Sequence, residues 1–267
     1  MKRKVYFLQK TVMICLFIVS ELLMGCAEKA SDLPDIAIVE ALEGERAETA
    51  RELTGNCVAR LDMEQNGVIY YGSALLWDVQ DEYLILVTAG HLLEQGKLNT
   101  ICFPDQDMTE ISIESSQRDF ALQYSTKYDT GFLKIPLERL EQEGIIGENA
   151  EGEIRLVSLH QRIFNTIDSY SDLHLTASSA EGAGDAALDA VLVEKSESLP
   201  EWDPELMIMQ CKAEAGMSGG GGFDAYGHLV GMILGGNGTE TAVLSMEKIN
   251  AAYLELYGIQ RNTEDYN

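Results

Sequence analysis

Three polar residues stand at the ends of short apolar runs, and their types suit a nucleophile, a base and an acid. Ser218 lies in the glycine-rich stretch GMSGGGGFDAYGHLVG, His91 in LVTAGHLL, and Asp129 at the start of DTGFLKIP. A serine hydroxyl is a weak nucleophile, so it needs a base to take its proton and a third group to orient that base. Each residue alone is a common structural residue, and only the three together indicate acyl-transfer chemistry.

Two other glycine-rich motifs fit the stretch around Ser218 less well. Residues 216–220 satisfy G-x-S-x-G, the nucleophile elbow of α/β-hydrolases, but that motif needs a helix after the serine and a histidine further on. A hairpin is expected here instead, and His228, the only later histidine, lies inside it. A phosphate-binding loop needs a lysine and a hydroxyl residue after its glycines, and neither is present. A flexible linker is not expected between two apolar β-runs.

The elements that must position these residues are mostly short strands. Runs such as VIYYGSALLW, EYLILVTAG and TGFLKIP recur from residue 57, and polar or glycine-bearing turns separate them. A short helix is expected at 137–144, and a C-terminal helix is expected to end at Gly258, a good C-cap. Regular short strands with little helix between them predict an all-β sandwich or barrel.

The three segments resemble, in the same order, the signature blocks of the chymotrypsin-fold serine peptidases, in the compact form of the HtrA-like group. The family patterns are TAAH, then D-x-A-L-L-K-I, then G-x-S-G-G-x-x-x-D-x-x-G-x-x-V-G. The resemblance covers about residues 57–245. It implies two six-stranded antiparallel β-barrels, a short C-terminal helix, and an active site in the cleft between the barrels. It implies no metal and no organic cofactor.

The resemblance assigns a role to each matching residue. Ser218 matches the nucleophile, His91 the general base, and Asp129 the acid that orients and stabilises the imidazole. The backbone N–H groups of Gly216 and Ser218 match the oxyanion hole. Asp119 also precedes a possible strand and is the alternative acid, although the alternation and final proline of TGFLKIP favour Asp129. The implied reaction is hydrolysis of a peptide bond through an acyl-enzyme.

The glycine-rich stretch departs from the family, which keeps other functions open. Gly221 stands where proline is usual, which removes a fixed φ and would loosen the loop. Met217 replaces the aspartate that pairs with a new N-terminus in the digestive enzymes, so no zymogen activation is expected. Lys212, near the floor of the family's specificity pocket, either favours acidic side chains or is an exposed strand residue. The alternatives to a peptidase are a protease-fold binding protein at the cell surface that has lost turnover, and an esterase.

The first 25 residues have the features of an export signal. A basic head is followed by the apolar run TVMICLFIVSELLMG, which is short for a membrane-spanning helix and is interrupted by Glu21. The run ends in Leu-Met-Gly-Cys, which resembles the lipobox of bacterial lipoproteins. Lipid on Cys26 is therefore expected to hold the protein at the extracytoplasmic face of the membrane. An ordinary signal peptide and an uncleaved anchor are the alternatives.

The chain is thus expected to divide into a signal peptide, an acidic tether, a peptidase domain and a polar tail, at residues 1–25, 26–50, 51–258 and 259–267. Within the peptidase domain we expect an N-terminal barrel at about 51–137, a C-terminal barrel at about 150–245 and a helix at 245–257. Nine residues follow Gly258, so no PDZ domain is expected there.

Charge and cysteine content limit the partners. The formal net charge is −25, which argues against nucleic acid because an acidic surface repels phosphate. Cys15 and Cys26 belong to the predicted signal and lipid site, which leaves Cys57, Cys102 and Cys211. These three have no CxxC spacing, so no zinc site is expected, and whether two of them form a disulfide stays open. The expected partners are a protein or peptide substrate and, through Cys26, the membrane.

Overall fold

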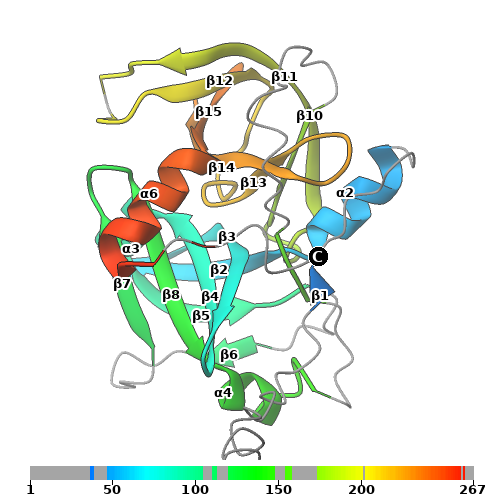
Figure 1. Cartoon of the computed structure of the whole chain (residues 1–267), viewed down its shortest axis with the longest axis vertical. Coiled ribbons are helices and arrows are strands. Elements are labelled where there is room, and N and C mark those ends of the chain that lie inside the picture. The colour runs from blue at the N-terminus through cyan, green and yellow to red at the C-terminus, as the bar shows by residue number, and fades with distance from the viewer. Residues whose placement is uncertain are drawn as a thin grey trace, which may run out of the picture. The chain divides into compact units, whose positions relative to one another are not determined.

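The structure is a computed structural model of the chain (Figure 1). It describes residues 37–38, 47–104, 110–112, 120–147, 154–157, 173–200, 202–259 and 261. All of these belong to one compact unit, Ile36–Asn267. The predicted signal segment, Cys26 and Asp119 lie outside the described residues. Within the described ranges, no helix combines the length and the hydrophobicity needed to cross a bilayer.

The N-terminal half forms an antiparallel sheet of seven strands in the order β6-β5-β2-β3-β4-β8-β7. The strands are β2 (Val58–Gln65), β3 (Val68–Gln80), β4 (Tyr83–Ala89), β5 (Lys97–Cys102), β6 (Glu110–Ser112), β7 (Ala121–Ser125) and β8 (Thr130–Pro136). Strand β4 is apolar on both faces because each face packs into a different core. Leu84 and Leu86 join one buried cluster, and Ile85 and Val87 join another.

The C-terminal half forms a closed antiparallel barrel of six strands in the order β10-β11-β12-β15-β14-β13. The strands are β10 (Leu173–Ala177), β11 (Ala186–Glu197), β12 (Leu206–Gln210), β13 (Gly221–Phe223), β14 (Leu229–Gly236) and β15 (Glu240–Ser245). The predicted all-β architecture, with two antiparallel β-structures followed by a C-terminal helix, is confirmed. The described part of the N-terminal sheet has one strand more than the predicted six and has edges at β6 and β7.

The C-terminal helix α6 (Met246–Tyr257) contacts strands of both β-structures (Figure 1). Its Tyr253 packs on Phe132, with ring centroids 5.1 Å apart, and on the edge of Trp77 at 6.1 Å. The helix ends as predicted at Gly258, which has the left-handed φ of 69° and donates its N–H to the carbonyl of Leu254. Burial of this aromatic face joins the two halves through one shared apolar core.

The remaining elements are short. They are α2 (Ala47–Gly55), α3 (Gly90–Gln95), α4 (Leu137–Gln142), β1 (Ala37–Ile38) and β9 (Arg155–Leu156). Helix α4 occupies the position of the helix predicted at 137–144. The predicted tether at 26–50 contains β1, which pairs in parallel with β9, and the first turn of α2. The sequence lacked a signal for β1 because two residues are too few to show an apolar alternation.

Candidate active site

His91 and Asp129 lie together at one end of the N-terminal sheet. Strand β4 ends at Ala89, which pairs with Thr130 at the start of β8. Antiparallel pairing therefore places the residues that follow β4 beside Asp129, which directly precedes β8. His91 Nδ1 lies 2.8 Å from Asp129 Oδ2, and the backbone N–H of His91 donates to Asp129 Oδ1 at 2.6 Å. The carboxylate thus binds both the ring and the backbone of the histidine.

The backbone around His91 restricts which residue types can occupy positions 90 and 129. Asp129 has a positive φ of 47°, a conformation that aspartate tolerates better than most residues. The N–H of Gly90 donates to the carbonyl of Asp129 at 2.9 Å. A Cβ atom at Gly90 would lie 2.8 Å from the backbone nitrogen of Thr130, so the alanine that is usual in the family patterns would force a shift here. Glycine at position 90 is therefore matched to the close approach of β8.

Asp129 is held in its charged form by its neighbours. Burial by itself raises the pKa of Asp129, but the hydrogen bonds and charge of His91 and a hydrogen bond from Trp202 outweigh burial and lower this pKa below its usual value. A charged carboxylate only accepts hydrogen bonds, so Nδ1 of His91 must carry the proton that it shares with Asp129. In the neutral ring, Nε2 is then the acceptor, which is the state a general base needs.

Ser218 lies in the turn before β13, on the C-terminal barrel, and is partly exposed. Its Oγ donates to the carbonyl of Leu234 at 2.9 Å, and within the described residues it shares no hydrogen bond with His91. Leu234 is free to accept because β14 has a bulge there, where Ile233 and Gly235 pair with successive residues of β15. Leu234 also lines the pocket that contains His91 and Asp129. The predicted serine does not itself line this pocket, but its hydroxyl is hydrogen-bonded to a residue that does.

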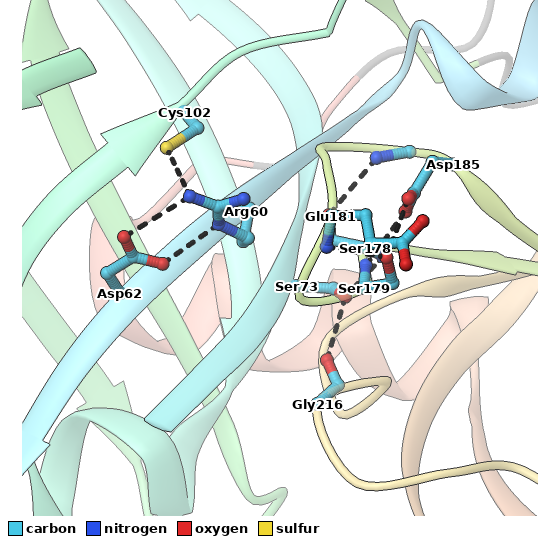
Figure 2. A network of polar contacts seen from close by, with 10 residues as sticks. Arg60, Asp62, Ser73, Cys102, Ser178, Ser179, Glu181, Asp185 and Gly216 are labelled. Atoms are coloured by element: carbon cyan, nitrogen blue, oxygen red, sulfur yellow. Dashed lines mark hydrogen bonds and ion pairs between the residues drawn. The ribbon is translucent and has the colours of Figure 1, made fainter. Parts of the chain in front are cut away.

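Ser73 of β3 connects the turn at Ser218 to the N-terminal sheet (Figure 2). Its Oγ donates to the carbonyl of Gly216 at 3.1 Å and accepts the N–H of Ser178 at 2.9 Å. Its backbone N–H donates to the carbonyl of Ser218 at 2.8 Å, and its own carbonyl accepts the hydroxyl of Thr88. Ser73 is fully buried, so these bonds are shielded from water. One residue of the N-terminal sheet thus orients two carbonyls of the serine turn.

The N–H groups of Gly216 and Ser218 have no hydrogen-bond acceptor within the part of the chain that the structure describes. In contrast, the N–H groups of Met217, Gly219 and Gly220 all donate to backbone carbonyls. Two free backbone donors, one on the serine itself and one two residues before it, can stabilise a negatively charged oxygen. The arrangement can therefore act as the oxyanion hole that the family resemblance implies.

Close packing explains most of the glycines in the stretch around Ser218. Gly216 and Gly219 have left-handed φ values of 97° and 88°, and a Cβ atom at Gly219 would lie 1.9 Å from the carbonyl oxygen of Ser73. Gly221 and Gly222 lie in β13, where they are buried and pair with both β10 and β14. The expectation that Gly221 loosens the loop is therefore wrong, because a strand in a closed barrel holds it.

A pocket of about 440 Å³ lies beside His91. The acidic residues Glu94, Asp129 and Asp203 line this pocket, and none of the lysines and arginines that the structure describes does. Trp202 and Tyr124 supply aromatic surface. The chemistry of this lining suits a substrate group with positive charge.

The other residues considered from sequence lie apart from this pocket. Lys212 is exposed and does not line it. Cys57, Cys102 and Cys211 form no disulfide within the described residues, and Cys102 Sγ accepts a hydrogen bond from Arg60. Within the described ranges, no cluster of His, Cys, Asp and Glu side chains could hold a metal ion.

Two residues of the site were not identified from sequence. A small polar residue inside an apolar strand, as Ser73 is in VIYYGSALLW, was an available signal, because buried polar groups need partners. Trp202 stands in a polar segment, LPEWDPE, where a large aromatic residue is unusual. Neither signal names the partner.

No model of a known protein family matches the sequence, and no curated protein matches it. Solved structures do match. The active form of the Rv3671c protease from M. tuberculosis matches with a TM-score of 0.57 at 14% identity, over 88% of this chain and 95% of that one. The HtrA-type protease AlgW, solved with a tripeptide, matches with a TM-score of 0.59 at 17% identity, over 80% of this chain and 64% of that one. Deg5 matches with a TM-score of 0.54 at 17% identity, over 81% of this chain and 99% of that one. The chain therefore has the chymotrypsin-like fold of HtrA-type serine proteases.

Proposed function

We propose that the protein is a serine endopeptidase in which Ser218, His91 and Asp129 are the nucleophile, the base and the orienting acid. The observation that carries this proposal is the binding of His91 by Asp129 at both the ring and the backbone. The exposed fractions of the two side chains are 28% and 14%, so the ring is open to a substrate while the carboxylate is largely shielded. The free N–H groups of the serine turn support the same proposal.

The reaction follows from these contacts. Ser218 Oγ leaves the carbonyl of Leu234, gives its proton to Nε2 of His91 and attacks the peptide carbonyl carbon. The N–H groups of Gly216 and Ser218 stabilise the oxyanion that forms. The C–N bond then breaks, and His91 returns the proton to the departing amine. Water repeats the sequence on the acyl-enzyme, giving its proton to His91 and releasing the acid and the free serine.

We also infer that the protein is exported and held at the extracytoplasmic face of the membrane by lipid on Cys26. The basic head, the apolar run and the cysteine at its end support this. The test is a Cys26→Ser variant of the full chain. It should lose its membrane association in cell fractionation, and unchanged retention would contradict lipidation.

One observation favours a second candidate, a protease-fold binding protein without turnover. Ser218 Oγ is bound to Leu234 and not to His91, so the serine is not activated in this arrangement. A neutral hydrogen bond of this kind contributes about 1 kcal/mol, which a bound substrate can readily replace. On the peptidase proposal the bond belongs to a resting state that substrate binding ends, and on the binding-protein proposal it persists.

A fluorophosphonate probe separates the two candidates. An activated serine attacks its phosphorus atom and displaces fluoride, so the full-length protein should be labelled at Ser218. Labelling should disappear in Ser218→Ala and fall strongly in His91→Ala. Ser179→Ala is the matched control, because Ser179 is partly exposed and its hydroxyl bonds to Asp185 and Glu181 rather than to the serine turn. A well-folded wild-type protein that takes no label would contradict the peptidase and favour the binding protein. Turnover of esters without peptides would favour an esterase.

A further inference from the structure

Trp202 makes a contact that joins the two halves of the molecule at the acid of the site. Its indole Nε1–H donates to Oδ2 of Asp129 at 3.0 Å, the same oxygen that lies 2.8 Å from Nδ1 of His91. Asp129 belongs to the N-terminal sheet. Trp202 lies in the connection between β11 and β12, on the C-terminal barrel. The acid is therefore bound by a residue 73 positions away in the sequence.

The indole is itself held in place on the C-terminal barrel. The backbone N–H of Trp202 donates to the carbonyl of Leu199 at 3.1 Å, which closes a turn in the connection. A Cβ atom built on Gly235 would lie 3.5 Å from Cζ2 and Cη2 of the indole, so the ring lies over the Gly235 backbone. Gly235 follows Leu234, the residue that binds the hydroxyl of Ser218. One aromatic ring thus contacts both the acid and the strand beside the nucleophile.

Three donors converge on the carboxylate of Asp129. Oδ1 accepts the backbone N–H of His91, while Oδ2 accepts from Nδ1 of His91 and from Nε1 of Trp202. Donors at both oxygens resist rotation of the carboxylate, and bonds to a charged acceptor are the stronger kind. A second donor on Oδ2 also reduces the negative charge that this oxygen offers to the imidazole.

We propose that Trp202 is a positioning residue that fixes the carboxylate of Asp129 and moderates its hold on His91. This inference rests on the proposed peptidase function. On this inference, the carboxylate of Asp129 has all three of its donors only when the β11–β12 connection is docked against the N-terminal sheet. If Trp202 served only to fill space, a ring of similar shape without the N–H would work equally well.

Trp202→Phe separates these roles, because it keeps an aromatic ring and removes the donor. We expect kcat to fall about tenfold, in line with the loss of one hydrogen bond to a charged group, and KM to change less than about twofold. The acid limb of the profile of kcat/KM against pH should move to higher pH, because a carboxylate with one donor fewer attracts the imidazolium more strongly. Glu205→Gln is the matched control on the same connection. It is exposed, does not line the pocket and should leave all three quantities unchanged.

A Trp202→Phe protein whose kcat and pH profile coincide with those of the wild type would overturn the inference. The outcome differs from failure of the proposed function, in which the wild type itself shows no turnover that depends on Ser218. In that case the proton NMR signal of the His91 Nδ1–H decides. A changed or lost signal in Trp202→Phe, with an unchanged signal in Glu205→Gln, supports positioning, and an unchanged signal in both variants excludes it.

Discussion

The hydroxyl of Ser73 donates to the carbonyl of Gly216 across the boundary between the two halves of the molecule, at 3.1 Å (Figure 2). The two residues are 143 positions apart. The contact means that the turn around the proposed nucleophile is shaped partly by the N-terminal sheet. Residues of the N-terminal half other than His91 and Asp129 are therefore expected to affect the proposed catalysis.

Ser73→Ala is expected to weaken both folding and activity. The substitution leaves the carbonyl of Gly216 and the N–H of Ser178 without their buried partner, which costs about 1–3 kcal/mol of unfolding free energy. The freed carbonyl lets the Gly216 peptide turn, so fluorophosphonate labelling should slow as well. Denaturant unfolding and labelling rates measure the two effects. Ser179→Ala provides the control, and a Ser73→Ala protein equal to it in both measurements would contradict the prediction.

Gly219→Ala is expected to abolish labelling, because two penalties act at once. The position has a left-handed φ, and its added Cβ would meet the carbonyl oxygen of Ser73 at 1.9 Å. Gly238→Ala is a matched control, since Gly238 has a φ of 93° but open space around it. The control should lose only the conformational term of about 1–2 kcal/mol. Equal losses of stability in the two variants would show that the contact with Ser73 is unimportant.

Because His174 is buried, the stability of the folded protein is expected to decrease as the pH falls. Burial, with the positive charge of Arg51, lowers the pKa of His174 from 6.5 to about 4, and its ring is 2% exposed and stacked on Phe223. Between these pH values the unfolded chain binds a proton that the folded protein does not. Stability is therefore fully present above about pH 6.5 and is lost as the pH falls towards 4, by about 3 kcal/mol at most.

The variant His174→Phe tests this prediction. It retains a ring beside Phe223 and removes the titrating group. The difference in unfolding free energy between wild type and variant should shrink or reverse in favour of the variant as the pH falls from 7 to 5. A difference that is the same at both pH values would exclude His174 as the cause.

The acidic lining of the pocket predicts a preference for substrates with positive charge. Glu94 and Asp203 are exposed, and no basic residue in the described part of the chain lines the pocket beside them, so a peptide with lysine near the scissile bond should have a higher kcat/KM than its glutamate counterpart. The preference should weaken with added salt. Glu94→Gln or Asp203→Asn should reduce it about two- to fivefold. A preference for glutamate instead would point to Lys212 as the residue that selects the substrate.

The sequence was informative where local pattern and pairing act together. A continuous apolar run identifies β4, apolar alternation identifies β8, and antiparallel pairing of these two strands is enough to place His91 beside Asp129. Ser73 and Trp202 could not be found in this way, since their roles depend on partners on the opposite half of the molecule.

The glycines show a second limit of the sequence. Gly221 suggested a loose loop because it stands where proline is usual, and a glycine has no side chain to reveal an inward face. In the structure a Cβ atom at Gly221 would meet the ring of Phe223 at 2.5 Å, so neighbouring side chains fill the space that these glycines leave. A pattern of alternating apolar residues cannot identify a buried strand position that is occupied by glycine and filled by the side chains of its neighbours.

The bulge at Leu234 has a consequence for how the protein would be controlled. It supplies the carbonyl that accepts the hydrogen bond of Ser218 Oγ, so on the proposed mechanism this bond must break, with rotation about the Cα–Cβ bond of Ser218, before the hydroxyl can give its proton to His91. Such rotations take picoseconds to nanoseconds and require no refolding of the surrounding turn. On the proposed mechanism, the protein would then need no slow conformational change before it could act on a peptide. Its proteolytic activity would then be limited by its location in the cell and by which peptides can enter the pocket.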